Sequence, residues 1–576
     1  MTFHHTGIGP LKTSSDQLVL DDLEKAELLN SYFIDACTQD NGILPPLPSL
    51  DTLEENETII DYIEFRTEQI KRVLKKLKRK TSSGPDDLPS ILFNSLACQL
   101  ASPLAKIYNC IMSAGKVPGL WKQARVIPIF KKGSSSSPKN YRPISLTCVD
   151  SKIFETTIKS VLVPFLEEKR LLSENQHGFR SKHSTCLNLL ESLNDWSQNF
   201  DSKIDTFVAH IDFARAFDSV SLPKLIHKLK WAGVRGTLLA CIESLLFGRT
   251  QQVKVGTSYS NPKSVVSGVP QGSVLGPTLF IFFINNITEA IPAPSTPKLY
   301  ADDLKAYCPD SAEAGEKTFQ DALVNITKWA DTWQLPISSE KSKWLLLTNR
   351  TKLQSTAKFE LAGVELPKTF DVVDLGINFN SKLNFNDHIT AIITKAKQRL
   401  FLLKKIFVSR NTSLLILGFK TYVIPILEYC SQVWNPNCAK NIRRIESVQR
   451  MFTKKLAGYQ GLNYKARLEK AGLCTLELRR LRADLCLCYK ILHGQIDTPI
   501  QKFFELDNSR QTRGHNWKLK LTTSRLESRL HFYSQRVVSP WNFLSKNTVN
   551  ATSFVSFKAL LQLECLDKFL IIKAHV

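Results

Sequence analysis

The sequence has no long apolar run and no ordered set of cysteines. Its longest apolar stretch, Leu279–Ile284, is far too short to span a bilayer, and its first residues contain no apolar signal core. The 13 cysteines are scattered without a Cys-x-x-Cys pair or zinc-knuckle spacing, which excludes a disulfide framework and a zinc module of that kind. These absences favour an intracellular protein in a reducing compartment, with no membrane as its partner.

Acidic residues are scarce relative to basic ones. The chain of 576 residues carries 76 Lys and Arg against 53 Asp and Glu, a net charge of +23. Residues 381–480 alone contain 19 basic and 5 acidic side chains. Such a surplus favours a polyanionic partner, although solvated helix faces would give the same count. A hydrophobic content of 43% indicates a globular chain with a large core.

Two adjacent carboxylates, Asp302 and Asp303, lie between short runs of strand-forming residues. The runs 297–301 and 304–308 predict a tight hairpin with both acids at its tip. The apolar run 206–211 predicts a buried strand that ends at Asp212. Three acids in this arrangement favour a site for two Mg²⁺ ions, for which Mn²⁺ could substitute, and an in-line phosphoryl displacement. An Asp-Asp pair alone is equally typical of a solvated turn, so the decision rests on the surrounding motifs.

Three motifs, taken in order, resemble those of the reverse transcriptases of non-LTR (LINE-type) retrotransposons. They are residues 212–218 (Asp-Phe-Ala-Arg-Ala-Phe-Asp), 267–280 and 300–303 (Tyr-Ala-Asp-Asp). Residues 427–436 resemble the jockey and chicken-repeat groups of these elements. The resemblance implies an RNA-directed DNA polymerase that extends a DNA primer or target 3′-OH on an RNA template, the element RNA, with dNTPs. It also implies synthesis in the cytoplasm and action in the nucleus.

The resemblance also implies a role for individual residues. Asp212, Asp302 and Asp303 would be catalytic, and they would bind the metal ions together with the carbonyl of Phe213. Phe217 would lie under the sugar of the incoming nucleotide. The other implied substrate-binding residues are Lys131, Arg142, Gln271 and Lys341. The implied nucleic-acid-binding residues are Arg180 and, in the basic block, Arg443, Arg444, Arg450, Lys454 and Lys455.

The alternatives for these residues are ordinary. Lys131 and Arg142 would suit a triphosphate as a point charge and a bidentate fork, and ordinary surface charge is the alternative. Gln271 could be a buried turn residue, and Phe217 could be a core residue. Gly268 and Gly272 are expected to let the backbone approach a ligand closely.

The expected fold is an α+β right-hand polymerase with fingers, palm and thumb, followed by a mainly helical basic C-terminal region. The expected units are an N-terminal linker (1–60), an N-terminal extension of the fingers (61–110), the reverse transcriptase domain of fingers and palm (111–379), a helical thumb (380–493) and a C-terminal tail (494–576). The tail is typical of either a nucleic-acid-binding element or a packed cap. The chain begins in what resembles a linker, so we expect no upstream endonuclease in it.

Periodicity predicts several local elements. They are a helix at 20–33, paired strands at 124–130 and 140–146, a helix capped by Ser221, strands at 370–378 that close the palm, and helices at 388–407, 413–434 with a kink at Pro425, 439–457 and 475–493.

Two other functions remain open. An RNA-dependent RNA polymerase usually shows Gly-Asp-Asp and a sugar-selecting Asp, whereas this chain has Ala301 and Phe217. A decayed or domesticated transposon product that only binds RNA would not need the three carboxylates, which are intact. The Pro-Asp-Asp at 85–87 lacks the partner acid and lysine of a nuclease.

Overall fold

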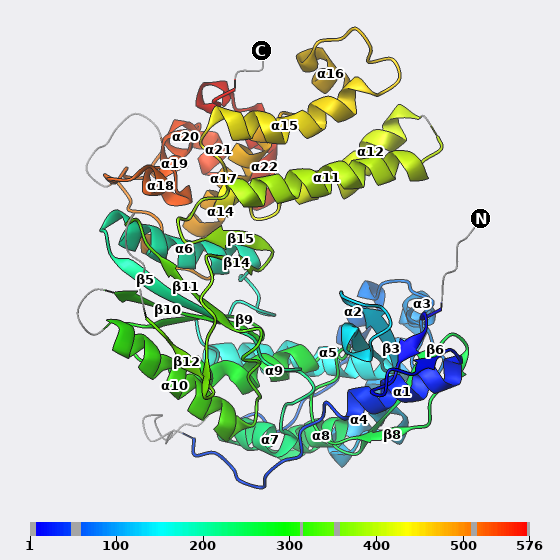
Figure 1. Cartoon of the computed structure of the whole chain (residues 1–576). Helices are drawn as coiled ribbons and strands as arrows, with labels where there is room; N and C mark the ends of the chain where they lie inside the picture. The colour runs from blue at the N-terminus through cyan, green and yellow to red at the C-terminus, as the bar shows by residue number, and fades with distance from the viewer. Residues whose placement is uncertain are drawn as a thin grey trace.

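The computed structural model describes residues 7–47, 59–310, 315–350, 357–409, 411–507 and 515–572. Helices and sheets form a C-shaped molecule (Figure 1). A four-stranded sheet forms the closed side of the C. A second sheet and its helices form one arm, and the C-terminal helices form the other.

The four-stranded sheet is antiparallel throughout and is called here the central sheet. Its strands, in spatial order, are β11 (Lys343–Leu347), β5 (Asp205–Ile211), β10 (Asp303–Asp310) and β9 (Thr296–Tyr300). β5 is apolar on both faces because both are covered: Phe207, Ala209 and Ile211 enter one core, and Val208 enters another. Leu304 of β10 lies opposite Ile211, so the β9–β10 turn adjoins the residue that follows β5.

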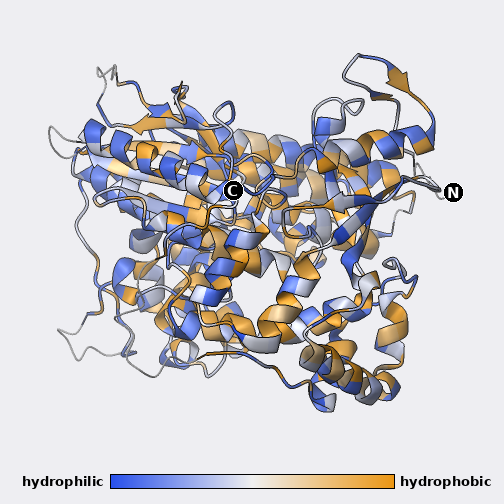
Figure 2. Cartoon of the chain, turned by 90° about the horizontal axis from the view of Figure 1, so that it is seen from below, coloured by the Kyte–Doolittle hydropathy of each residue, from blue (hydrophilic) through white to orange (hydrophobic). Residues whose placement is uncertain are grey.

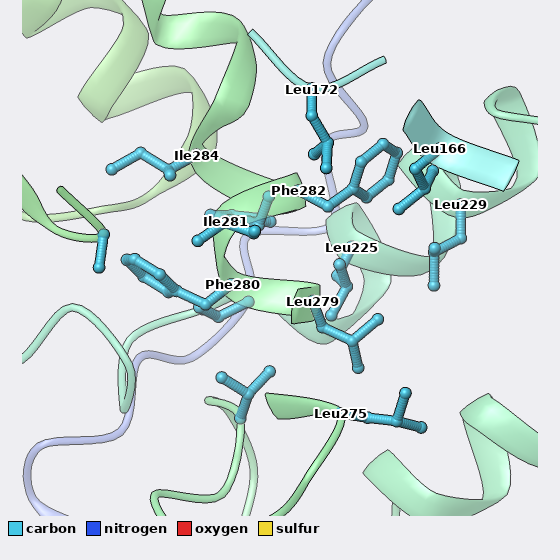
Figure 3. Close-up of a cluster of buried hydrophobic side chains, with 14 of the residues drawn as sticks. Leu166, Leu172, Leu225, Leu229, Leu275, Leu279, Phe280, Ile281, Phe282 and Ile284 are labelled. Atoms are coloured by element: carbon cyan, nitrogen blue, oxygen red, sulfur yellow. The ribbon is translucent and has the colours of Figure 1, made fainter. Parts of the chain in front are cut away.

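The first core lies between the central sheet and a layer of helices. These are α4 (Ala97–Ala114), α5 (Val149–Glu168), α7 (Leu222–Trp231), α8 (Gly236–Leu246), α9 (Gly276–Ile284) and α10 (Gly315–Trp333). α9 is apolar around its circumference because it is surrounded: Leu279 points toward Leu225 and Leu229 of α7, and Phe280 points to the opposite side (Figure 3). The side chain of Ser221 accepts from the Lys224 N–H at 3.3 Å, which confirms the predicted cap of α7.

The second sheet contains β4 (Tyr141–Leu146), β3 (Gln123–Phe130), β6 (Arg249–Val255), β7 (Ser258–Tyr259) and β8 (Lys263–Val265). The predicted antiparallel pairing of β3 with β4 is confirmed. β3 also pairs with β6 in parallel, a long-range contact that periodicity does not reveal. α2 (Thr67–Lys76) and α3 (Ser90–Ser95) pack beside α4.

The N-terminal segment is more than a spacer. Residues 1–6 and 48–58 of the expected linker lie outside the described residues. The rest forms β1 (Leu11–Lys12), β2 (Leu18–Val19) and α1 (Asp22–Ile34). α1 packs on the second sheet, where Asn30 donates to the Ser260 hydroxyl at 2.9 Å. Beyond α1, Lys224 donates to Asn41 at 2.7 Å, so this segment is bound to the α7 side of the molecule.

Two short hairpins follow the central sheet. They are β12 (Glu360–Leu361) with β13 (Val364–Glu365), and β14 (Asp371–Asp374) with β15 (Ile377–Asn380). The strands predicted at 370–378 are therefore present, but they form a separate two-stranded sheet and do not extend the central one. Asp374 pairs with Lys305 of β10 at 2.7 Å, which holds the β14–β15 hairpin against the central sheet.

The C-terminal helical region follows. Its helices are α11 (Asn386–Ile406), α12 (Thr412–Tyr422), α13 (Ile424–Glu428), α14 (Ser431–Trp434), α15 (Ala439–Lys454), α16 (Tyr464–Ala471) and α17 (Leu476–Leu492). The predicted single kink at Pro425 is wrong. The segment breaks into three helices, because proline interrupts the hydrogen bonding of α12 and Cys430 takes a left-handed φ of 49° before α14.

The C-terminal segment packs against α6 (Thr185–Asp201) and α17. Its helices are α18 (Glu527–Leu530), α19 (Tyr533–Arg536), α20 (Val538–Phe543), α21 (Lys546–Val549) and α22 (Phe554–Leu563). Trp541 and Phe557 are fully buried, so the described residues form a packed cap.

Polar contacts tie this segment to α6, which covers the second face of the central sheet. Glu191 of α6 lies 3.0 Å from the Lys502 ammonium and 2.5 Å from that of Lys298 on β9. The guanidinium of Arg529 donates to Asn194 at 3.0 Å.

The helices mix hydrophilic and hydrophobic residues along their length (Figure 2). Among the described residues, no helix has both the length and the apolarity that a membrane crossing requires.

Candidate active site

The β9–β10 turn consists of Ala301 and Asp302, between the paired residues Tyr300 and Asp303. Ala301 takes a left-handed φ of 58°, which is strained for a residue with a side chain. The buried Gln176 stabilises this conformation. Its carbonyl oxygen accepts from the Ala301 N–H at 2.9 Å, and its amide donates to the Ala301 carbonyl at 3.3 Å.

Gly178 lies against the same turn. A Cβ at this position would meet the Ala301 nitrogen at 2.3 Å, closer than any side-chain carbon can approach. Sequence reasoning assigned no role to Gln176 and Gly178, and named only Arg180 of this segment. Their function is to hold the turn that carries the two acids.

The Gly178→Ala variant is expected to unfold at a lower temperature, because the added methyl group must displace the turn. Overpacking of this kind costs about 1–3 kcal/mol. Thermal unfolding followed by circular dichroism measures the effect. Gly9→Ala is the matched control, because nothing lies within 4 Å of a Cβ at that position. Equal unfolding temperatures for the two variants would contradict the close contact.

Asp212, Asp302 and Asp303 come together as the sequence predicts. Burial, followed by the charges of Asp302, Asp374 and Asp212, raises the pKa of Asp303 to about 6. Burial is also the largest cause of the raised pKa of Asp302, to which Asp212 contributes. Beyond burial, each of these acids feels the negative charge of its neighbours, and an opposite charge among them would favour their ionised forms, so the cluster suits cations.

Basic side chains face these acids from two directions. The Lys341 ammonium lies 3.1 Å from Asp212. Lys131 follows β3 and Arg142 lies on β4, and their charges favour the ionised form of Asp302. Burial, then the neighbouring charges of Arg142 and Lys341, lower the pKa of Lys131. Cations of the second sheet and acids of the central sheet thus act on one another.

A cavity of about 290 Å³ opens beside this cluster. Asp212 and Asp303 line it on one side, and Lys132 and Lys341 contribute positive charge. This lining is suited to a ligand that carries both negative charge and bound cations.

The carbonyl of Phe213 follows Asp212 directly in the chain. Phe213 forms an isolated bridge with Ile337, but its neighbours make the hydrogen bonds: Ser338 donates to the Asp212 carbonyl at 2.7 Å, and Ala214 donates to the Pro336 carbonyl at 2.8 Å. The bridge therefore leaves the Phe213 carbonyl free for another partner.

Phe217 is half-buried and rigidly supported. Its ring stacks on the fully buried Phe280 of α9, with 4.2 Å between centroids and 14° between planes. Its other neighbour is the exposed ring of Phe179, at 6.2 Å in an edge contact. The stack holds one face of the Phe217 ring in place. A ring that contacts a ligand through its other face needs such support.

Gln271 is held by an acid. Its amide donates to both oxygens of Asp218, at 3.0 and 3.2 Å. Burial raises the pKa of Asp218 to about 6. Glu155 of α5 supports the same loop by accepting from the N–H groups of Val274 and Leu275 at 2.7 and 2.9 Å. Sequence reasoning missed Glu155, because nothing in a helical sequence distinguishes a buried glutamate from an exposed one.

Gly268 and Gly272 lie against protein backbone. A Cβ on Gly268 would lie 2.7 Å from the Asp218 backbone, and one on Gly272 would lie 2.2 Å from the Ser145 carbonyl. Both glycines thus permit close approach to protein backbone, while the approach of a ligand to them stays a prediction.

Arg180 is engaged inside the protein. Its side chain is 4% exposed and pairs with Glu167 through two hydrogen bonds, at 3.0 and 2.5 Å. It also donates to the Ser173 carbonyl at 2.6 Å. These contacts give Arg180 a structural role, which corrects the expectation that it binds nucleic acid.

The basic residues of α15 divide into two groups. Arg443, Lys454 and Lys455 are exposed. Arg444 bridges to Thr390 of α11 at 2.8 Å, and Arg450 lies over the ring of Tyr464 at 4.4 Å. The second pair therefore stabilises the packing of α15 on its neighbours.

A second cluster of metal-ligand types lies at the start of α5. Asp86, Cys148 and Asp150 have one ligand atom each within 4.8 Å of one another, and no other such group of three occurs among the described residues. Both Asp150 oxygens already accept hydrogen bonds, from Trp121 and from the Ser151 N–H, at 2.8 Å. Asp212, Asp302 and Asp303 do not form such a group, so not all of their ligand atoms lie within 4.8 Å of one another.

Comparison with known proteins agrees with this site. Residues 129–403 match the family model described as reverse transcriptase (RNA-dependent DNA polymerase). The chain is 32% identical over 413 residues to the probable RNA-directed DNA polymerase from transposon BS of Drosophila melanogaster, covering 70% of this chain and 46% of that protein.

Two further relatives from Drosophila melanogaster are similar. The RNA-directed DNA polymerase from mobile element jockey is 30% identical, over 68% of this chain and 44% of its own length. The probable RNA-directed DNA polymerase from transposon X-element is 27% identical, over 72% of this chain and 47% of its own length. The chain spans about half the length of these curated relatives. Residues 129–403 thus belong to the reverse transcriptase family, within a chain homologous to the RNA-directed DNA polymerases of jockey-like non-LTR retrotransposons.

Proposed function

We propose that the chain is an RNA-directed DNA polymerase that extends a DNA primer on an RNA template with dNTPs. The observation that carries the proposal is the meeting of Asp212, at the end of β5, with Asp302 and Asp303 on the adjoining turn. The family match and the relatives' names support the same activity.

In this proposal the central sheet with its helices is the palm, and the second sheet with residues 61–110 forms the fingers. The region 380–493 is the thumb, and the described part of 494–576 is a cap that braces thumb and palm. The open side of the C would receive the template–primer duplex (Figure 1).

The acids suit divalent cations. Carboxylate and carbonyl oxygens are the ligands that Mg²⁺ prefers, and Asp212, Asp302, Asp303 and the Phe213 carbonyl would hold two such ions, with Mn²⁺ as a substitute. When bound, the ions would stabilise the charge that develops during in-line attack of the primer 3′-OH on the α-phosphate.

The chain's own groups would position the nucleotide. Lys131 and Arg142 would contact the triphosphate, and Lys341 would neutralise the leaving pyrophosphate. Gln271, oriented by Asp218, would contact the nascent base pair or sugar. The half-buried Phe217 would lie against the sugar. Positioning and charge stabilisation would supply most of the rate enhancement.

A primer-extension assay tests the proposal. The purified chain, given poly(A), oligo(dT), dTTP and Mg²⁺, should extend the primer, and EDTA should stop it. Failure to extend with either Mg²⁺ or Mn²⁺, despite tight binding of the duplex, would favour the RNA-binding product without polymerase activity. Extension with UTP in preference to dTTP would favour an RNA polymerase.

The cations of α11 are expected to supply much of the nonspecific affinity for nucleic acid. In Figure 1, α11 lies between α15 and the second sheet, and Lys395, Lys397 and Arg399 of α11 are exposed. Replacing these three with Ala should flatten the dependence of log K on log salt by up to about three, because each lost phosphate contact removes roughly one unit of slope.

Arg443→Ala, Lys454→Ala and Lys455→Ala together remove the same charge from α15 and form the matched variant. We expect them to change the slope by about one or less, since α11 lies between α15 and the open side of the C (Figure 1). An unchanged slope in both variants would place the nucleic acid elsewhere.

A further inference from the structure

A groove of about 720 Å³ lies at the base of the C-terminal helical region, and we call it the rear groove. It runs along α17 and α22, which pack against each other (Figure 1). Its basic side chains are Lys420, Arg479, Arg482, Lys490 and Lys558. The one acid among the described lining residues, Glu428, pairs with Arg479.

Four positive charges therefore remain uncompensated. Lys420, Arg482, Lys490 and Lys558 form no ion pair within the part of the chain that the structure describes. Three of these charges lie near one point. Lys558, Lys490 and Arg482 each favour the thiolate form of Cys486, which lines the groove. Convergent, unpaired cations in a concave site favour a bound polyanion.

Arg482 carries a second sign of a missing partner. It donates to the Cys474 sulfur at 3.3 Å and to the Gln562 carbonyl at 3.2 Å, which fix its guanidinium between α17 and α22. Its Nε is buried and has no hydrogen-bond partner among the described residues. Buried donors are rarely left unpaired in proteins, so an acceptor is expected here.

The groove also contains an aromatic ring. Phe554 is half-buried, and the ammonium groups of Lys490 and Lys558 lie 4.3 and 5.8 Å from its centroid. Basic grooves with interspersed aromatic rings are typical of proteins that bind single-stranded nucleic acid, because every base can stack on a ring and every phosphate can pair with a cation.

The chain connects the groove to the β14–β15 hairpin. Gln432 lines the groove and lies three residues after Tyr429. The Tyr429 hydroxyl donates to the Leu375 carbonyl at the tip of the β14–β15 hairpin, at 2.9 Å. Tyr429 also interacts electrostatically with Tyr300, beside the two acids.

We propose that the rear groove binds a single-stranded segment of nucleic acid that extends beyond the duplex. Lys420, Arg482, Lys490 and Lys558 contact its phosphates, and Phe554 stacks on a base. An apolar partner does not fit, because it would desolvate four unpaired charges. The inference rests on the proposed function for the nucleic acid held nearby, but its test requires no catalysis.

The test compares binding of the full chain to a blunt RNA–DNA duplex and to the same duplex with a single-stranded RNA or DNA overhang. In the variant Lys420→Ala/Lys490→Ala/Lys558→Ala, the gain in affinity from an overhang should fall about tenfold. The salt slope for overhang substrates should flatten by about two, at roughly 0.7 per single-strand contact. Affinity for the blunt duplex should stay within about twofold. A larger effect on the RNA overhang or on the DNA overhang identifies which strand occupies the groove.

The matched control is Lys106→Ala/Lys317→Ala/Lys328→Ala, which removes three exposed lysines from α4 and α10 and should leave the overhang gain unchanged. Phe554→Leu keeps every charge and should reduce the overhang gain without changing the salt slope. An unchanged overhang gain in both groove variants overturns the proposal, as does an equal loss on the blunt duplex or competition by an acidic polypeptide as strong as by single-stranded RNA.

Primer extension on poly(A) is measured separately. A wild-type chain that fails to extend, but whose overhang gain responds to the groove variants, would overturn the polymerase and leave the groove standing. Normal extension, together with an overhang gain that does not respond to the groove variants, would overturn the groove proposal and leave the polymerase standing.

Discussion

Primer extension by Asp302→Asn is expected to fall by at least about a thousandfold, with the affinity for duplex unchanged. A metal-bridged transition state is worth several kcal/mol, and each 1.36 kcal/mol is tenfold in rate. An amide keeps the shape of the carboxylate and loses its charge. Single-turnover extension of oligo(dT) on poly(A), with binding measured in parallel, gives both quantities.

The same variant should be at least as stable as the wild type when divalent ions are absent. Burial and the neighbouring Asp212 raise the pKa of Asp302 in the folded chain. An acid with a raised folded-state pKa destabilises the fold at pH values above that pKa, because the unfolded state ionises more readily. Asn removes this cost. Lost activity is therefore separated from unfolding by thermal denaturation at neutral pH.

Asp321→Asn is the matched control, since Asp321 is exposed on α10 and should tolerate the change in every assay. Extension by Asp302→Asn at more than about a tenth of the wild-type rate would refute the metal assignment.

Phe217→Val is expected to raise the use of UTP relative to dTTP by orders of magnitude. The ring is held in place by its stack on Phe280, so it cannot turn aside for an added 2′-OH. Valine opens that space and adds no polar group. The ratio of kcat/KM for dTTP and UTP on both proteins measures the effect, and part of the dTTP activity should remain.

A core residue would behave differently. Because Phe217 is also packed on the first core, the variant should lose about 1–3 kcal/mol of stability in either case. Phe319→Val provides the comparison: Phe319 is fully buried on α10 and stacks on Phe207 of β5, so its replacement should lower stability and leave the sugar ratio unchanged. If Phe217→Val gives the same unchanged ratio, the ring does not select the sugar.

The strand, the hairpin and the three acids are predictable because they depend on local patterns. An apolar run buried on both faces and two short strands joined by Asp302 are legible in sequence, and antiparallel pairing then places Asp212 beside them. The fingers cations Lys131 and Arg142 follow from a hairpin of the same kind.

Contacts between distant segments were not predictable. Gln176 reaches the turn across 125 residues, and its side chain carries no local sign of a partner. The role of Gly178 is set by the turn that it touches. Gly272 resembled a ligand-binding glycine, and only the fold reveals the Ser145 carbonyl against it. Arg180 shows the converse error, since charge in a motif does not distinguish an exposed arginine from one paired with Glu167.

The binding of α6 to the C-terminal segment has a consequence for how the protein is made. Asn194 contacts Arg529 across 335 residues. At translation rates of about 5–20 residues per second, α6 emerges roughly twenty to seventy seconds before the residues that cover it. During that time the nascent chain presents an unfinished apolar face on α6, and Glu191 can pair with Lys298 but not yet with Lys502, so aggregation is favoured until the C-terminal segment is complete.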